Sequence, residues 1–162
     1  MDKLNQWLTL LANLGVLVGI GFLAYEVRQN TDAIHSQTRA TMFAGAQEEL
    51  WKNMEYPDVT LNMQSGTVGL TDEEKVRLDA WLTASLRARE FAWIEYTNGN
   101  IDEEQWRAEQ EVIKIILGTQ RTRDWWDNVT SSTFHKDFVA VVRELTNDQP
   151  ESEFVESILS IE

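Results

Sequence analysis

Charged side chains within an otherwise apolar segment are the residues of this sequence best suited to binding chemistry. Arg87 and Glu90 lie three positions apart within residues 80–96, a spacing at which two side chains of one helix can pair. Trp93 lies four positions after Arg89, within reach of a cation–π contact. Because enclosed charges need partners, Arg87, Glu90 and Trp93 form a candidate small-molecule pocket. The simpler interpretation, which we favour, is an internal ion pair that fixes the helix register.

Catalytic chemistry has little support in the residue types. The chain has no cysteine, which excludes thiolate nucleophiles and disulfides. A Ser-His-acid triad would have to use His35 or His135, and no serine lies in a glycine elbow. Asp32 and His35 have the acid-x-x-His spacing of di-iron bundles, but no second copy of it occurs. We therefore predict no catalytic residue, no metal site and no cofactor, and a protein that is not an enzyme.

Composition narrows the classes of partner. The 162 residues carry a formal net charge of -13, from 27 acidic and 14 basic side chains. So acidic a chain is unsuited to the phosphate backbone, and this excludes nucleic acid as a partner. The length leaves room for one anchor and one modest domain.

After a short flank of residues 1–6, an apolar run from Trp7 to Tyr25 contains no charged side chain. At the helical rise of 1.5 Å per residue it spans about 28 Å, close to the hydrocarbon thickness of a bilayer. Residues 22–25 offer no small-x-small site for signal-peptide cleavage. We predict an uncleaved transmembrane helix over residues 7–25, with the lipid bilayer as partner and Trp7 and Tyr25 as anchors at the two membrane interfaces.

One face of this helix gathers small and polar residues. Gly15 and Gly19 form a GxxxG motif, which allows two helix backbones to approach closely. Asn13 lies near mid-span, where an amide is costly against lipid and prefers a partner across a helix interface. We therefore predict a homo-oligomer that associates through Ala12, Asn13, Gly15 and Gly19.

A second interpretation of the same face is a homo-oligomeric, cation-conducting pore. Asn5, Thr9 and Asn13 are four apart and would line a narrow polar channel. An acidic domain at its mouth would concentrate cations. Against this alternative, Val16 and Ile20 make the remaining half of the face apolar.

The orientation in the membrane follows from the flanking cations. Lys3 precedes the apolar run, and Arg28 and Arg39 follow it. The positive-inside rule therefore places the C-terminal domain in the cytoplasm, by a margin of one side chain.

No proline or glycine occurs between Gly21 and Gly45, so the helix is predicted to continue as a juxtamembrane stalk over residues 26–56. Alternatively, Asn30, Thr31 and Asp32 could cap a new helix near the membrane surface. The apolar residues of the stalk form an approximately helical stripe: Val27, Ile34, Thr41, Phe43, Ala44, Ala46, Leu50, Trp51 and Met54.

A helical bundle is predicted over residues 57–147. Pro57 suits the first turn of a short helix that ends near Gln64. Thr71 and Glu74 form a capping box at the start of a long helix, which Gly99 ends. This helix is apolar on nearly every side and is predicted to be central.

Further helices follow the central one. Asp102 is predicted to cap the next helix, and a short helix then carries Trp125 and Trp126. Adjacent helical residues point 100° apart, so we expect one ring in the core and the other at an edge. Residues 131–132, both serine, are predicted to cap the last helix of the bundle, and residues 148–162 form an acidic C-terminal tail.

Motifs along nearly the whole chain suggest a relationship. They are ANLGVLVGIGFLAYEVRQNTDAI, YPDV before a glycine-containing loop, LTDEEKVRL, GNIDEEQW, RDWW and FHKDFVAVV. In this order they resemble a broad set of uncharacterised bacterial membrane-anchored proteins. The resemblance implies their architecture and a bacterial origin, and with the apolar run it leads us to expect a place in the bacterial inner membrane. It implies no activity and no functional residue.

The sequence thus predicts an all-α protein in which an N-terminal transmembrane helix continues into a stalk and is followed by a small helical bundle. We expect a single-pass membrane protein whose bundle is an interaction or regulatory domain, with an unidentified membrane protein as a further candidate partner. The cation-conducting pore is the alternative, and a membrane-bound small-molecule sensor is a further alternative.

Overall fold

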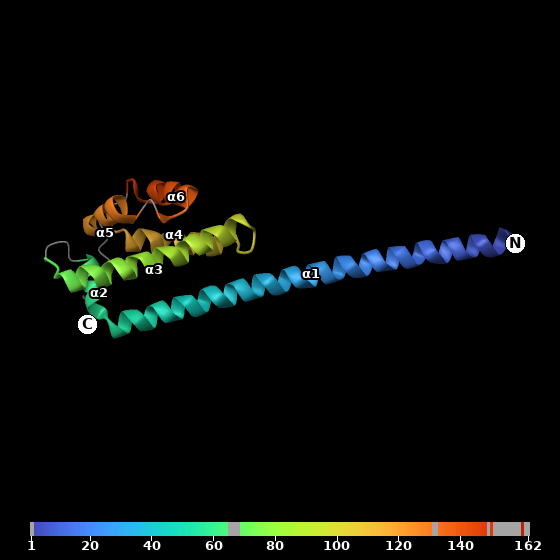
Figure 1. The fold of residues 1–162 in the computed structure, drawn as a ribbon, viewed down its shortest axis with the longest axis horizontal. Coiled ribbons are helices and arrows are strands. Elements are labelled where there is room, and N and C mark those ends of the chain that lie inside the picture. Colours follow the sequence, from blue (N-terminus) through green and yellow to red (C-terminus); the bar gives the residue numbers. More distant parts are fainter. Residues whose placement is uncertain (1, 65–68, 131–132, 149, 151–159, 161–162) are drawn as a thin grey trace. The chain divides into compact units, whose positions relative to one another are not determined.

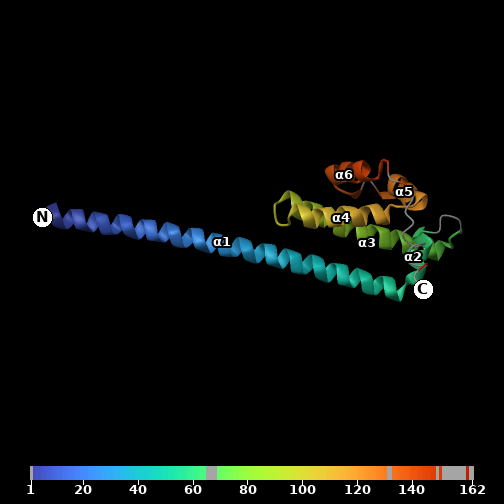
Figure 2. The same ribbon diagram turned by 180° about the vertical axis from the view of Figure 1, so that it is seen from behind.

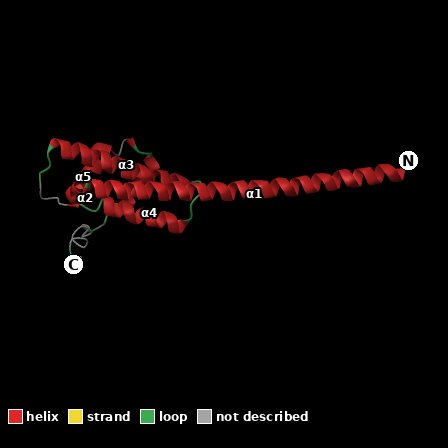
Figure 3. Ribbon diagram, turned by 90° about the horizontal axis from the view of Figure 1, so that it is seen from below, coloured by secondary structure: helices red, strands yellow, loops and turns green. Residues whose placement is uncertain are grey.

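A computed structural model describes the chain except residues 1, 65–68, 131–132, 149, 151–159 and 161–162, and every regular element in the described part is helical (Figures 1 and 3). The predicted all-α fold is therefore confirmed. The elements are α1 (Asp2–Glu55), α2 (Pro57–Gln64), α3 (Asp72–Thr97), α4 (Glu103–Ile116), α5 (Gln120–Trp125), a π-helical turn η1 (Trp126–Thr130) and α6 (Lys136–Thr146).

The chain divides into two compact units, residues 1–38 and residues 39–162. The first unit consists of the first part of α1. The second combines the last part of α1 with all later helices, so the compact bundle unit begins before residue 57.

Helix α1 contains the one segment of the described residues that is long and apolar enough to cross a membrane. Its large apolar side chains within residues 4–27, Trp7 and Tyr25 among them, are all more than half exposed. The helix also continues through residues 30–32, where Thr31 Oγ1 donates to Val27 O at 3.0 Å. That bond is typical of a threonine inside a helix, so the alternative of a new helix start at this point is wrong.

The capping box predicted at Thr71 and the cap predicted at Asp102 are both present. The Thr71 side chain accepts from Glu74 N, and the Glu74 carboxylate accepts from Thr71 N at 2.8 Å. Asp102 and Gln105 make the same reciprocal pair at the start of α4. Each box satisfies two backbone donors that the first helical turn leaves without a partner.

Glycine is required at the end of α3. Gly99 has a φ of +76°, a conformation that L-residues with a side chain rarely adopt. The chain reverses there, and Asn100 N donates back to Glu95 O at 2.8 Å. Helix α4 then returns along α3, and the two contact each other in the bundle (Figure 2).

Helix α3 is the central helix of the bundle, as predicted. Leu82, Leu86 and Ala92 on it are fully buried, and it contacts both α2 and α4. Helices α4 and α6 complete the core with amphipathic faces that include the fully buried Ile113, Phe138 and Val142.

The two adjacent tryptophans separate as expected. Trp126 is buried and packs against Phe134, with ring centroids 5.1 Å apart. Trp125 is half-buried, and its Nε1 donates to Asp79 at 2.8 Å. One ring therefore belongs to the core and the other fastens α5 to the outer face of α3.

The N-cap of α6 is His135, whose Nδ1 accepts from Asp137 N at 3.3 Å. The predicted serine cap at residues 131–132 lies outside the described residues. The same holds for most of the predicted acidic tail, of which only residues 148, 150 and 160 are described.

Candidate functional site

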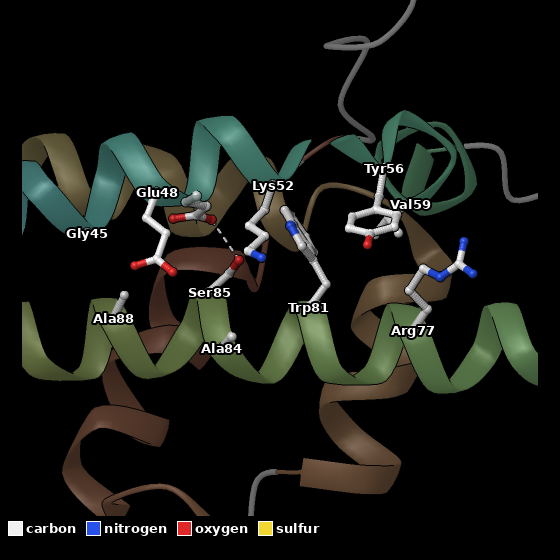
Figure 4. A pocket seen from close by; sticks show the side chains of 11 residues that line it. Gly45, Glu48, Lys52, Tyr56, Val59, Arg77, Trp81, Ala84, Ser85 and Ala88 are labelled. Atoms are coloured by element: carbon white, nitrogen blue, oxygen red, sulfur yellow. Dashed lines mark hydrogen bonds between the residues drawn. The ribbon is translucent and has the colours of Figure 1, made fainter. Parts of the chain in front are cut away.

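A cleft of about 490 Å³ separates the last turns of α1 from α3 (Figure 4). Helix α1 provides Gly45, Glu48, Glu49, Lys52 and the following Tyr56 to its wall, and α3 provides Arg77, Trp81, Ala84, Ser85 and Ala88. The volume lies in the range of small-molecule sites.

Small side chains account for the space. Ala84 and Ala88 are one turn apart on α3, and Gly45 has no side chain on the opposite helix. A Cβ added at Gly45 would meet no atom within 4 Å. The two helices therefore meet through long side chains rather than through close backbone packing.

Three polar contacts bridge the cleft. Ser85 Oγ donates to Glu49 Oε1 at 2.6 Å, and Arg89 Nη1 donates to Glu49 Oε2 at 2.5 Å. Trp81 Nε1 donates to Asn53 Oδ1 at 2.8 Å. Glu49 thus holds α1 to α3 with both of its carboxylate oxygens.

Arg89 is the centre of a charge cluster that joins three helices. Its Nε lies 3.2 Å from Glu109 Oε2 on α4, an ion-pair distance whose geometry falls short of a hydrogen bond. The side chains of Arg89, Glu49 and Glu109 are 8%, 20% and 23% exposed. Burial raises the pKa of the Glu109 carboxyl above its usual value; Arg89 opposes this shift, and the negative charge of Glu49 adds to it. Two carboxylates share one guanidinium here.

Two charged groups in the cleft remain available to a ligand. Figure 4 shows Glu48 and Lys52 extending from α1 toward α3. They have the Glu-to-Lys spacing that favours pairing along a helix, yet Glu48 has no hydrogen-bond or ion-pair partner among the described residues. Lys52 lies 3.9 Å from Glu55, at the limit of an ion pair. Besides the engaged Glu49 and Arg77, the largely apolar wall therefore carries one acid and one base that a ligand can reach.

Arg77 at the far end of the cleft is fully engaged. It pairs with Asp58 at 2.7 Å and with Glu73 at 3.1 Å, and its guanidinium lies 5.5 Å from the centre of the Tyr56 ring. The pair with Asp58 joins α2 to α3 at this end of the cleft.

The residues predicted as a ligand pocket lie elsewhere, at the junction of α3 and α6. Arg87 Nη1 pairs with Glu90 Oε2 at 2.5 Å, as the spacing predicted. Glu90 Oε1 also accepts from His135 N at 2.6 Å, and the Arg87 guanidinium lies 4.3 Å from the centre of the Phe134 ring. Trp93 contacts His135, with ring centroids 5.2 Å apart. In the structure, Arg87, Glu90 and Trp93 hold the start of α6 against α3.

The expected cation–π contact of Arg89 with Trp93 is replaced by the contacts of Arg89 with Glu49 and Glu109. Sequence reasoning missed Glu49, Ser85 and the cleft. The available signal was the pair of alanines on α3 beside a buried arginine, but only the fold shows that Gly45 lies opposite them.

The residues predicted for association and conduction are exposed on the first part of α1: Asn5, Thr9, Ala12, Asn13, Gly15 and Gly19. Thr9 Oγ1 donates to Asn5 O at 2.9 Å, so its hydrogen is already bonded within the helix. The pore stays a prediction, as does the oligomer.

No group of three or more acidic or histidine side chains among the described residues is placed to hold a metal ion.

Comparisons with known proteins give no relative. No protein-family model matches the chain, no curated protein is similar to it, and no solved structure matches it. The resemblance to uncharacterised bacterial membrane-anchored proteins therefore stays a prediction.

Proposed function

We propose that this chain is a single-pass membrane protein whose helical bundle is an interaction or regulatory domain held at the membrane. The observation that carries the proposal is that every large apolar side chain in the apolar part of α1 is more than half exposed and none is buried. Nineteen residues without a charge would leave a large apolar surface in water, which soluble monomers avoid. A lipid bilayer covers such a surface along its whole length.

The first test is extraction of membranes with alkaline carbonate. Leu14→Arg combined with Leu17→Arg places two charges near mid-span, at a cost of about 3 kcal/mol each. The wild-type chain should stay in the pellet and the double variant should not. Gln37→Arg, an exposed position beyond the span, is the control and should behave like the wild type. Release of the wild-type chain by carbonate would refute the anchor.

The proposed location is the bacterial inner membrane with the bundle in the cytoplasm. Because the chain has no cysteine, a single Lys3→Cys or Asp148→Cys variant carries one label site. A membrane-impermeant maleimide applied to spheroplasts should label position 3 and not position 148. The reverse pattern would invert the topology.

Self-association through the small-residue face is part of the proposal. A Cβ added at Gly15 or Gly19 would meet no atom within 4 Å, so a larger side chain fits the single chain. Gly15→Leu with Gly19→Leu should therefore weaken the oligomer without disturbing the fold. Gly21 is equally open but lies on the opposite side of the helix, so Gly21→Leu is the matched control. Equal energy transfer between labelled copies of all variants in nanodiscs would refute this contact.

The cleft supports a second candidate function, a membrane-bound small-molecule sensor. Its wall is largely apolar, with Trp81 in it and with Glu48 and Lys52 available for charged groups. Small aromatic amino acids, which combine both charges with an apolar body, are suitable probes for saturation-transfer NMR. Ala84→Leu with Ala88→Leu should fill the cleft and abolish the signal, whereas Ala108→Leu on the exposed face of α4 should not.

A further inference from the structure

The part of α1 within the bundle unit carries an apolar face that the described chain leaves uncovered. Phe43, Leu50, Trp51 and Met54, here termed the outer stripe, are between 63% and 70% exposed. The same turns of α1 face the bundle with the half-buried Met42, Glu49 and Asn53, two of which are polar. In this segment, mostly polar side chains therefore face the bundle and large apolar side chains face away from it, which is the reverse of an ordinary amphipathic helix.

The spacing of the outer stripe matches a helix–helix seam. Phe43 and Leu50 are seven residues apart, and Met54 follows four residues later. These are the positions that repeat along the contact of two parallel helices in a coiled coil. Gln47 occupies the seam position between them, where an uncharged amide can bond with the same amide of a second copy. Trp51 adjoins the seam and widens it.

Charge does not oppose the contact of two identical faces here. The positions flanking the seam are Ala44, Ala46, Trp51 and Asn53, none of them charged. Glu48, Glu49 and Lys52 fall on the remaining sides of the helix. Although the chain carries a net charge of -13, two outer stripes can meet without placing like charges opposite each other.

We propose that the outer stripe binds the outer stripe of a second copy of this chain, as a short parallel helix pair outside the membrane. This inference rests on the proposed anchor for its orientation. In each copy the apolar span precedes residue 39, so anchored copies present α1 from the same side, and each seam residue meets its own counterpart. Confinement to one membrane also raises the effective concentration of the two faces.

The absence of cysteine allows a direct test by disulfide cross-linking of the full chain in native membranes. In a parallel pair in register, Leu50→Cys meets Leu50→Cys and should form covalent dimers with copper phenanthroline. Glu55→Cys is the matched control, because Glu55 is similarly exposed, lies on another side of the helix and does not line the cleft. The expected result is a dimer yield several-fold higher at position 50 than at position 55. Equal yields at the two positions would indicate random collision and overturn the proposal.

A second variant tests the contact without cross-linking. Leu50→Asp with Met54→Asp is combined with Gly15→Leu and Gly19→Leu, so that the contact proposed within the membrane does not hold the copies together. All four positions are exposed, so helical content by circular dichroism should be unchanged, and the oligomer that remains in the Gly15→Leu, Gly19→Leu chain should be lost. An oligomer that persists unchanged with both aspartates would overturn the proposal.

The outcomes separate this inference from the proposed function. Carbonate-resistant chains that cross-link at Gly15→Cys but not at Leu50→Cys would refute the outer-stripe contact and leave the anchored, self-associating helix intact. Chains released by carbonate that still cross-link at Leu50→Cys would refute the anchor and keep the outer-stripe contact. Anchored chains without a cross-link at either position would refute both contacts and indicate a different protein on the stripe.

Discussion

Arg89 of α3 and Glu49 of α1 form the closest polar link between the two helices, a 2.5 Å hydrogen bond between side chains that are both largely buried. The positive charge of Arg89 neutralises the buried negative charge of Glu49, and Glu109 pairs with the same guanidinium. Removing either partner of a buried pair is costly, because the other charge stays in a poorly solvated place.

Arg89→Met should therefore destabilise the bundle by about 3 kcal/mol, since it leaves Glu49 and Glu109 without their cation. The measurement is thermal or chemical unfolding in a membrane mimic, followed by tryptophan fluorescence. Arg107→Met is the matched control: its pair with Glu103 is exposed, so the change should stay within about 0.5 kcal/mol. A similar loss in both variants would contradict the buried cluster.

Glu109 should make stability depend on pH in a defined direction. Burial raises the pKa of its carboxyl above the usual 4.5, so the folded state holds the proton more tightly than the unfolded chain does. This contribution is fully present below about pH 4.5 and is lost as the pH rises through the raised pKa. The melting temperature of Glu109→Gln, relative to that of the wild type, should therefore increase as the pH rises above 4.5. A difference that is constant with pH would contradict the shift.

The carboxyl groups of Asp72 and Glu74 make stability depend on pH in a lower pH range. The hydrogen bond and the charge of Lys75 lower the pKa of Asp72, and hydrogen bonds from the Thr71 backbone and side chain lower that of Glu74. Their contribution is present above their usual values, 3.8 and 4.5, and is lost as the pH falls through the lowered values. Melting curves of Glu74→Gln and of the wild type should therefore converge in acid and differ near neutral pH.

Glu90→Ala should release the start of α6 from α3. It removes the acceptor of His135 N and the partner of Arg87, and a buried hydrogen bond to a charged group contributes about 1.5–3 kcal/mol. Relative to the wild type, backbone amide hydrogen exchange in Glu90→Ala should become faster in residues 135–139 and change less in α4. Glu111→Ala, which breaks an exposed pair with Lys114, is the control and should leave both segments unchanged.

Substitutions of two glycines, Gly99 and Gly45, should change the free energy of unfolding in opposite directions. Neither site offers a steric clash, because a Cβ added at Gly99 or Gly45 meets no atom within 4 Å. Gly99→Ala should cost about 1 kcal/mol, because only its positive φ disfavours a side chain. Gly45→Ala, inside α1, should stabilise by about 0.5–1 kcal/mol. Equal effects in unfolding experiments would contradict the assigned backbone conformations.

The N-cap of α6, His135, was not predicted. Local signals in the sequence were sufficient for the caps of α3 and α4, the Arg87–Glu90 pair and the different environments of Trp125 and Trp126. Each depends on residues close in the chain, where spacing alone decides the geometry. The cleft depends on Gly45 lying opposite Ala84 and Ala88, about forty residues later, and spacing within one helix carries no information on that. The outer stripe shows the same limit: a periodic apolar pattern identifies a face, but it does not say what covers the face.

The contacts between α1 and α3 also determine how the bundle bears force. Helix α1 reaches α3 through Glu49 and Asn53, with Met42 packed at the edge of the core. A pull along the axis of α1 would load these hydrogen bonds together, in shear, while the apolar core around α3 stays unstrained. Under tension, α1 should therefore detach from the bundle before the bundle unfolds.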